Sequence, residues 1–120
     1  MKMRYLNNWA IELSDFDISK STTQIAHLIA NLTLEHMVVV IRNQNLTPEQ
    51  QINFCSKIGA YQSTDTDRAK DISLTDGVLR VTGQKNQRGE EGLFGHTSAL
   101  DWHANQASNY ERKPLIWLYG

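Results

Sequence analysis

The first half of the chain carries regular patterns of apolar and polar positions. Residues 9–13, "WAIEL", alternate apolar and polar side chains, which predicts a short half-buried strand. Residues 21–35 predict a helix, because Ser21 and Gln24 fit a capping box at its start. Its apolar positions recur at helical spacing and are Ile25, Leu28, Ile29 and Leu32. We expect this apolar stripe to pack against a core.

A second strand and helix follow. "MVVVIR", residues 37–42, is apolar until its last position, which predicts a central strand covered on both faces. Thr47 and Gln50 fit another capping box, and Pro48 occupies the favoured first helical position. Gly59 is expected to end this helix. The residues expected on its buried side are Ile52, Cys55 and Ile58.

The second half of the chain is more polar. Residues 60–77 predict a long surface loop of the kind that forms lids or binding segments. "VLRVTG" at 78–83 and "PLIWLYG" at 114–120 predict strands, with a glycine-punctuated loop after the first. The whole pattern predicts one mixed α/β (α+β) domain over residues 1–120, with its helices in the first half. Because a final strand needs neighbours in a sheet, we expect the domain to be incomplete, the front part of a larger fold.

Composition excludes several classes of function. The chain has 120 residues, 12 of them Lys or Arg and 13 Asp or Glu, so its charge indicates neither a nucleic-acid partner nor an anionic membrane. Its apolar runs are far shorter than the roughly 20 residues that span a bilayer, and no apolar signal-peptide core is present. We therefore expect a cytoplasmic protein. Cys55, the single cysteine, is expected to be a small buried hydrophobe rather than a reactive thiol.

The candidate chemistry lies in residues 93–109, which include "ALDWHANQASN" at 99–109. His103 and Asn105 are two residues apart, so both donor side chains would lie on one side of an extended strand. In a 2-His-1-carboxylate iron site, such a pair is joined by a distant histidine. A short pattern of this kind also arises by chance, so a hydrogen-bonded surface or core histidine stays open as the alternative.

A longer stretch carries a family resemblance. "VVVIRNQNLTPEQQINFCSKIG" resembles the strand, turn and helix near the start of the taurine/2,4-D dioxygenase family, the Fe(II)- and 2-oxoglutarate-dependent oxygenases. "VLRVTG", a glycine-containing loop and "DWHAN" follow in the family's order, and Trp102 and His103 match its "W-H-x-D". The matching positions of the first stretch are Arg42, Gln44, Leu46, Thr47, Pro48, Glu49, Gln50 and Gly59.

The resemblance implies the N-terminal part of a double-stranded β-helix (jelly roll) with two flanking helices. It also implies Fe(II), the co-substrate 2-oxoglutarate and hydroxylation of a small-molecule substrate. His103 would be the first histidine ligand, and position 105 would supply the carboxylate ligand. The family's second histidine and its 2-oxoglutarate-binding arginine lie downstream of this motif, and the chain ends before them. The resemblance therefore covers the N-terminal portion of the family's domain and implies a chain that is inactive alone.

Asn105 stands where the family has a carboxylate, and three interpretations are open. Its carbonyl oxygen could bind iron as a neutral ligand that holds the metal less firmly. The position could supply no ligand, as in related halogenases that admit chloride beside a small residue. Asp101 could supply the carboxylate instead, because residues 101, 103 and 105 share one face of an extended strand. The favoured alternative for Asp101 is a carboxylate that forms a turn or orients His103.

Three further residues are candidates for a substrate pocket. Tyr61 begins the long loop, His96 lies in a glycine-rich segment, and Trp102 adjoins the metal turn. For His96 the alternative is an exposed loop histidine, and for Trp102 it is a packing aromatic.

Two classes of function follow from these patterns. The first is the Fe(II)/2-oxoglutarate-dependent oxygenase acting on a small molecule. The second is a non-catalytic, truncated or degenerate relative that serves as a binding module. Sheet edges and apolar side chains such as Ile116, Leu118 and Tyr119 would be exposed in a partial jelly roll, which predicts a homo-oligomer or a missing C-terminal segment. A closed zinc site would need more Cys and His residues than the chain provides.

Overall fold

The computed structural model describes residues 1–60, 73–81, 85, 89, 102 and 115–120. The chain divides into two compact units, Met1–Tyr61 and Gln62–Gly120, and each is considered by itself. The described residues form a mixed α/β structure with a small open sheet and two helices, as the sequence predicts. The jelly roll itself stays a prediction, since the described strands do not form one.

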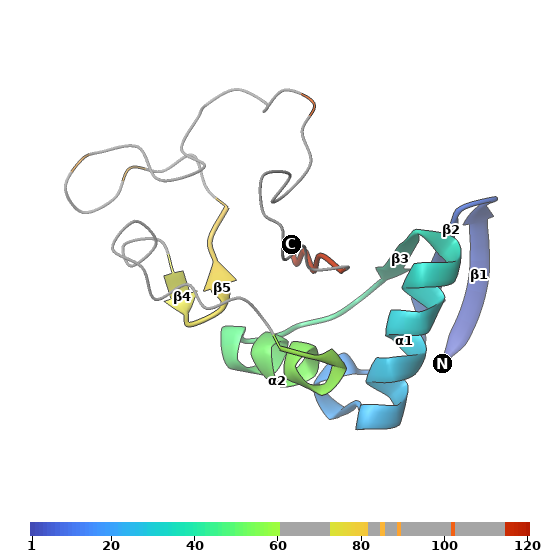
Figure 1. Ribbon diagram of the computed structural model, residues 1–120, viewed down its shortest axis with the longest axis horizontal. Helices are drawn as coiled ribbons and strands as arrows, with labels where there is room; N and C mark the ends of the chain where they lie inside the picture. The colour runs from blue at the N-terminus through green and yellow to red at the C-terminus, as the bar shows by residue number, and fades with distance from the viewer. Residues whose placement is uncertain (61–72, 82–84, 86–88, 90–101, 103–114) are drawn as a thin grey trace. The chain divides into compact units, whose positions relative to one another are not determined.

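The first unit contains a three-stranded sheet in the order β1-β2-β3 (Figure 1). β1 pairs antiparallel with β2, and β2 pairs parallel with β3. Helix α1 connects the two parallel strands, which makes β2-α1-β3 a βαβ unit. The elements are β1 (Lys2–Asn7), β2 (Ala10–Ser14), the 3₁₀ helix η1 (Ile18–Lys20), α1 (Thr23–His36), β3 (Val38–Ile41) and α2 (Pro48–Ile58).

β1 is a strand that the sequence patterns did not predict. All six of its residues are exposed, so no alternation of buried and exposed positions marks it. Its register pairs Lys2 with Ser14 and Tyr5 with Ile11. The turn to β2 is closed by Asn7, whose Oδ1 accepts a 2.9 Å hydrogen bond from the backbone N–H of Trp9.

β2 confirms the strand predicted at residues 9–13, whereas β3 corrects the prediction of a central strand. Ile11 and Leu13 are fully buried, and β2 is the middle strand of the sheet. β3 lies at the edge of the described sheet, and Val38 is 40% exposed. An apolar run does not by itself distinguish an edge strand from a central one, and in the described structure no residue of β3 is fully covered.

The core of the first unit gathers residues from the sheet, both helices and the connections between them. In α1 the buried residues are Ala26, Ile29 and Ala30, so Ile29 confirms part of the predicted stripe. Leu28, which was expected in the stripe, is 41% exposed. The buried face of α1 is therefore formed by Ala26, Ile29 and Ala30 and does not include Leu28. The buried apolar residues are Ala10, Ile11, Leu13, Ile18, Ala26, Ile29, Ala30, Leu46 and Phe54.

The start of α1 differs by one residue from its prediction. Thr22 is the N-cap, and its Oγ1 accepts a 3.3 Å hydrogen bond from the backbone N–H of Ile25. The predicted capping box of Ser21 and Gln24 is therefore wrong. Ser21 instead ends η1, where its backbone N–H donates to the carbonyl of Ile18 at 3.0 Å. A 3₁₀ turn directly before the helix occupies the residue that the sequence pattern placed at the cap.

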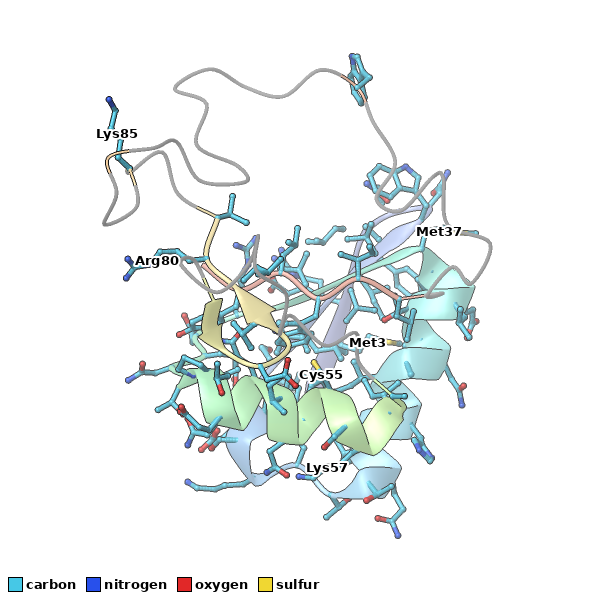
Figure 2. The ribbon with its side chains drawn as sticks, turned by 60° about the vertical axis from the view of Figure 1, so that its left-hand side comes forward. Met3, Met37, Cys55, Lys57, Arg80 and Lys85 are labelled. Carbon is cyan, nitrogen blue, oxygen red and sulfur yellow. The ribbon has the colours of Figure 1, made fainter. Side chains whose placement is uncertain are left out.

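The capping box of α2 is confirmed. Thr47 Oγ1 accepts from the backbone N–H of Gln50 at 3.3 Å, and Gln50 Oε1 accepts from the backbone N–H of Thr47 at 2.9 Å. Pro48 begins the helix and Gly59 is its C-cap. The buried positions are Gln51 and Phe54. The predicted positions Ile52, Cys55 and Ile58 are only half-buried, and Cys55 lies along α2 near Lys57 (Figure 2).

In the second unit, β4 (Ser73–Thr75) and β5 (Val78–Leu79) form an antiparallel hairpin. β4 lies inside the segment 60–77 that was predicted to be a loop, whose first part falls outside the described residues. The strand predicted at 78–83 is confirmed only as β5, since Arg80 and Val81 lie outside it. Residues 115–120, predicted to form a strand, are described without regular structure. β-branched and aromatic residues favour a strand only where a neighbouring strand pairs with them.

Candidate functional site

Most of the predicted metal turn falls outside the described residues. This applies to His103, Asn105 and Asp101, and also to the pocket candidates Tyr61 and His96. Their roles stay predictions. Trp102 is described and is fully exposed, at 105% of its reference area. Its side chain packs into no core in the described structure, so the packing interpretation of this tryptophan gains no support.

The two other histidines lie on α1. His27 is exposed, whereas the side chain of His36 is 12% exposed at the last position of the helix. The His36 ring meets the ring of Tyr5 edge-on at 5.5 Å, and its Nε2 lies 3.7 Å from the carboxylate of Glu35. Among the described residues, no group of three His, Cys, Asp or Glu side chains is placed to hold a metal. Neither histidine of α1 therefore belongs to a metal site in the described structure.

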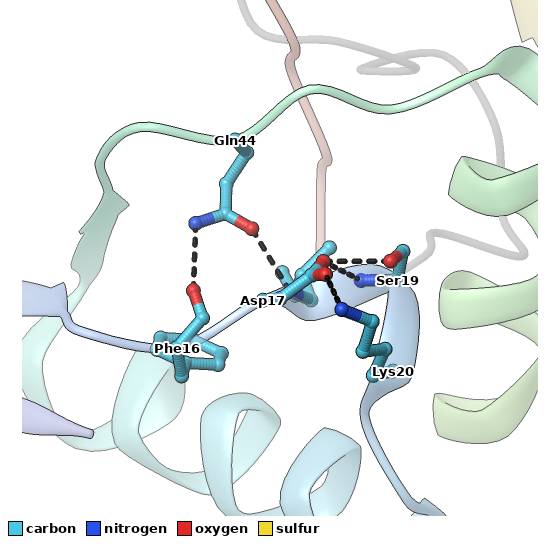
Figure 3. Close-up of polar contacts among 6 residues, drawn as sticks. Phe16, Asp17, Ser19, Lys20 and Gln44 are labelled. Carbon is cyan, nitrogen blue, oxygen red and sulfur yellow. Dashed lines mark hydrogen bonds and ion pairs between the residues drawn. The ribbon is translucent and has the colours of Figure 1, made fainter.

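The first stretch that carries the family resemblance, residues 38–59, is described, and Gln44 has a structural role in it. Its Oε1 accepts a 2.9 Å hydrogen bond from the backbone N–H of Ile18. Its Nε2 donates to the carbonyl of Phe16 at 3.0 Å (Figure 3). The same Nε2 donates to the carbonyl of Arg42 at 2.7 Å. One side-chain amide thus joins the connection before α1 to the connection after β3. Buried or half-buried backbone groups need such partners, so this contact fixes the path of both connections.

The segment held by Gln44 is stabilised further by its own side chains. Asp17 caps η1 and accepts from the backbone N–H of Ser19 at 3.0 Å and from its hydroxyl at 2.6 Å (Figure 3). Lys20 pairs with the same carboxylate at 3.0 Å. The Ser19 hydroxyl bond, followed by Lys20, holds the pKa of Asp17 below its ordinary value. Lys57 of α2 donates to the carbonyl of Ser21 at 2.6 Å, which joins α2 to the end of η1.

Arg42 directly follows β3 and forms a charged row with Glu12 of β2 and Arg4 of β1. Its Nε donates to Oε2 of Glu12 at 3.0 Å, and Nη2 of Arg4 donates to Oε1 of the same carboxylate at 3.0 Å. The Glu12 side chain is 14% exposed. These two hydrogen bonds, that from Arg42 first, hold the pKa of Glu12 below its ordinary value. The sequence pattern placed Glu12 at a polar strand position but gave no sign of its partners.

The remaining family positions serve the start of α2. Leu46 is 6% exposed and belongs to the core, while Thr47 and Gln50 form the capping box. The pKa of Glu49 is lowered by a hydrogen bond from its own backbone N–H and by a second from the Thr47 side chain. A carboxylate in the first turn also favours the helix, because it faces the positive end of the helix dipole. These positions build and hold a helix terminus.

Cys55 has the environment expected of a structural cysteine. It is free and half-buried on α2, and burial raises the pKa of its thiol. The thiol, rather than the nucleophilic thiolate, therefore predominates near neutral pH. This agrees with the prediction that Cys55 is not a reactive thiol, although Cys55 is half-buried rather than buried.

Comparison with known proteins identifies a family. No curated protein and no solved structure matches the chain. In the described part of the chain, no helix is long and apolar enough to cross a membrane. The family model of the taurine catabolism dioxygenase TauD, TfdA family matches residues 2–120, and the family is generally dependent on Fe(II) and 2-oxoglutarate. With the match extending over nearly its whole length, the chain belongs to the taurine catabolism dioxygenase TauD, TfdA family.

Proposed function

We propose that this protein is an Fe(II)- and 2-oxoglutarate-dependent oxygenase that hydroxylates a small molecule. The observation that carries the proposal is the family match over residues 2–120. Within this range, the sequence at Trp102 and His103 resembles the family's W-H-x-D metal motif. The proposed metal region is residues 93–109, and the long segment 60–77 is the proposed contributor to substrate specificity. Specificity in such folds resides in loops positioned by a rigid scaffold.

The donor chemistry of this region fits an iron site in part. His103 supplies an imidazole, and Asn105 or Asp101 supplies an oxygen donor two residues away. Bound Fe(II), together with 2-oxoglutarate and oxygen, supplies the oxidising power for hydroxylation of a C–H bond. A neutral amide attracts a divalent cation less strongly than a carboxylate does. We therefore expect weaker iron binding than an aspartate at position 105 would give.

A complete facial triad needs a third protein ligand, and 2-oxoglutarate needs a basic anchor. His27 and His36 are placed on α1, and neither lies in a group of three potential ligands within the described residues. We therefore propose that the described residues alone do not complete the iron site. The neutral amide at position 105 favours the second candidate function, a non-catalytic relative that retains the fold and binds a ligand.

The test is an anaerobic titration of Fe(II) in the presence of 2-oxoglutarate, followed by the metal-to-ligand charge-transfer absorption. We compare the unmodified chain with Asn105→Asp, Asp101→Asn and His103→Ala. The proposal predicts a stronger band in Asn105→Asp than in the unmodified chain, and no band in His103→Ala. Asp15→Asn serves as a matched control, because Asp15 pairs with Lys2 at the end of β2.

The variants separate the alternatives. A band in the unmodified chain that disappears in Asp101→Asn would assign the carboxylate to Asp101. A band in Asn105→Asp alone would show that the amide prevents binding and that the rest of the site is intact. No band in any form would refute the oxygenase proposal for this chain and favour the non-catalytic relative.

A further inference from the structure

β1 presents an edge of the sheet that only one neighbour occupies. In the described part of the chain β1 pairs with β2 alone, and it is the outermost strand beside β2 in Figure 1. All six residues of β1 are exposed. A strand at a sheet edge directs alternate backbone N–H and C=O groups outward, where they are ready to pair with another extended chain.

The two faces of β1 differ in chemistry. Met3 and Tyr5 are the register partners of Leu13 and Ile11, so they lie on the face of the sheet that α1 covers, yet they are 51% and 64% exposed (Figure 2 labels Met3). Lys2 and Arg4 lie on the opposite face, and their side chains are 80% and 69% exposed. An edge strand that is apolar on one face and basic on the other fits a partner strand that is apolar on the first face and acidic on the second.

The charges on the basic face alternate from strand to strand. Glu12 of β2 lies between Arg4 of β1 and Arg42 beyond β3, with both guanidinium groups 3.0 Å from its carboxylate. One carboxylate therefore serves two cations, and the row ends at the sheet edge on Arg4. A guanidinium carries five N–H donors, and only Nη2 of Arg4 is engaged with Glu12. Continuing the alternation by one strand would set an acidic residue beside Arg4.

We propose that the β1 edge receives an extended segment of another polypeptide as a fourth strand. This segment carries acidic residues on the face of Arg4 and apolar residues on the face of Met3 and Tyr5. A second copy of β1 fits less well, because the antiparallel register that opposes Met3 to Tyr5 also opposes Arg4 to Arg4. The proposal rests on β1 and its charges, and it is independent of the oxygenase chemistry.

The test uses the full chain and a short synthetic peptide that alternates valine and glutamate. Binding is followed through the backbone amide signals of the protein in NMR spectra. We expect the peptide to shift the β1 amides, and Arg4→Gln to weaken binding about two- to five-fold, the value of one cross-strand charge pair. Arg42→Gln is the matched control. It also removes a partner of Glu12, but away from the β1 edge, so the affinity should change less than it does in Arg4→Gln.

Two peptide variants separate strand addition from simple charge attraction. Methylation of alternate backbone nitrogens removes the donors that a fourth strand needs, and should abolish the shifts. Replacement of glutamate by lysine should also abolish them. Equal binding of either variant, shifts confined to residues outside β1, or no shifts at all would overturn the proposal. Self-association of the chain that Arg4→Gln strengthens would assign the edge to a second copy and overturn it as well.

Discussion

The side-chain amide of Gln44 accepts a 2.9 Å hydrogen bond from the backbone N–H of Ile18, which lies 26 residues earlier in the chain. Ile18 is fully buried, so its N–H has little access to water if this acceptor is removed. We expect Gln44→Ala to lower the free energy of unfolding by about 1–3 kcal/mol, the usual cost of an orphaned buried donor. Urea denaturation followed by circular dichroism measures this loss.

Gln24→Ala provides the control for this variant. Gln24 lies exposed in the first turn of α1, and its replacement should change the free energy of unfolding by less than about 0.5 kcal/mol. Equal effects of the two substitutions would contradict the bridging role of Gln44.

A neighbouring pair of hydroxyls tests the corrected start of α1. Thr22 caps the helix, so Thr22→Ala should cost about 1 kcal/mol. Ser21 is 7% exposed, and its Oγ is buried without a hydrogen-bond partner in the described structure. Ser21→Ala should therefore leave the free energy of unfolding unchanged or raise it, because a buried unsatisfied hydroxyl is removed. Thermal or urea unfolding of the two variants measures this difference. A larger loss of stability in Ser21→Ala than in Thr22→Ala would indicate that Ser21 is the N-cap.

Glu12 should make stability depend on pH. Its pKa is lower in the folded protein than its ordinary value of 4.5, so its contribution is complete above that value. The contribution is lost as the pH falls through the lower, folded-state pKa, where protonation removes the carboxylate from Arg42 and Arg4. Urea midpoints measured downward from pH about 6 should fall less steeply in Glu12→Gln than in the unmodified chain.

Asp17→Asn is the companion variant for this pH series. The pKa of Asp17 is also lowered, so Asp17→Asn should independently reduce the fall of the urea midpoint with decreasing pH. If the urea midpoint of Glu12→Gln fell with pH as steeply as that of the unmodified chain, the contacts of Glu12 with Arg4 and Arg42 would not contribute to acid unfolding.

The exposed apolar residues predict self-association of the isolated chain. Ile116, Leu118 and Tyr119 are 55%, 81% and 41% exposed. We expect size-exclusion chromatography with light scattering to give species larger than the monomer, and Leu118→Gln to shift the population toward the monomer. A sharp monomer peak for the unmodified chain would contradict this prediction.

Local signals in the sequence predicted local structure well. The capping box of Thr47 and Gln50, the first-turn position of Pro48 and the alternation around Ile11 each depend on residues within one helical turn or one strand. β1 was missed even though Lys2, Met3, Arg4 and Tyr5 alternate in polarity, and all six of its residues are exposed in the structure. A strand that is exposed on both faces is defined by its pairing partner rather than by its own pattern.

Contacts between distant residues were not predictable in the same way. Arg42 meets Glu12 across 30 residues of sequence, and Gln44 meets Phe16 across 28. Such pairs depend on the parallel register of β2 and β3, which no short pattern encodes. For the metal turn, only the family match supports the sequence interpretation, and the ligand roles of His103, Asn105 and Asp101 stay predictions.

The residues around Gln44 stabilise the fold, whereas the proposed metal ligands lie elsewhere in the sequence, and this separation affects how such a protein can diverge. The positions that make the first stretch recognisable cap a helix, fill the core or hold two connections together, so selection for a folded protein alone suffices to retain them. Positions that are proposed to bind metal, such as 105, are instead subject to selection for chemistry. A lineage could therefore exchange a metal-binding carboxylate for an amide, lose or alter its reaction, and still inherit an unchanged N-terminal scaffold. A protein can therefore keep the fold of the family after it has lost the family's reaction.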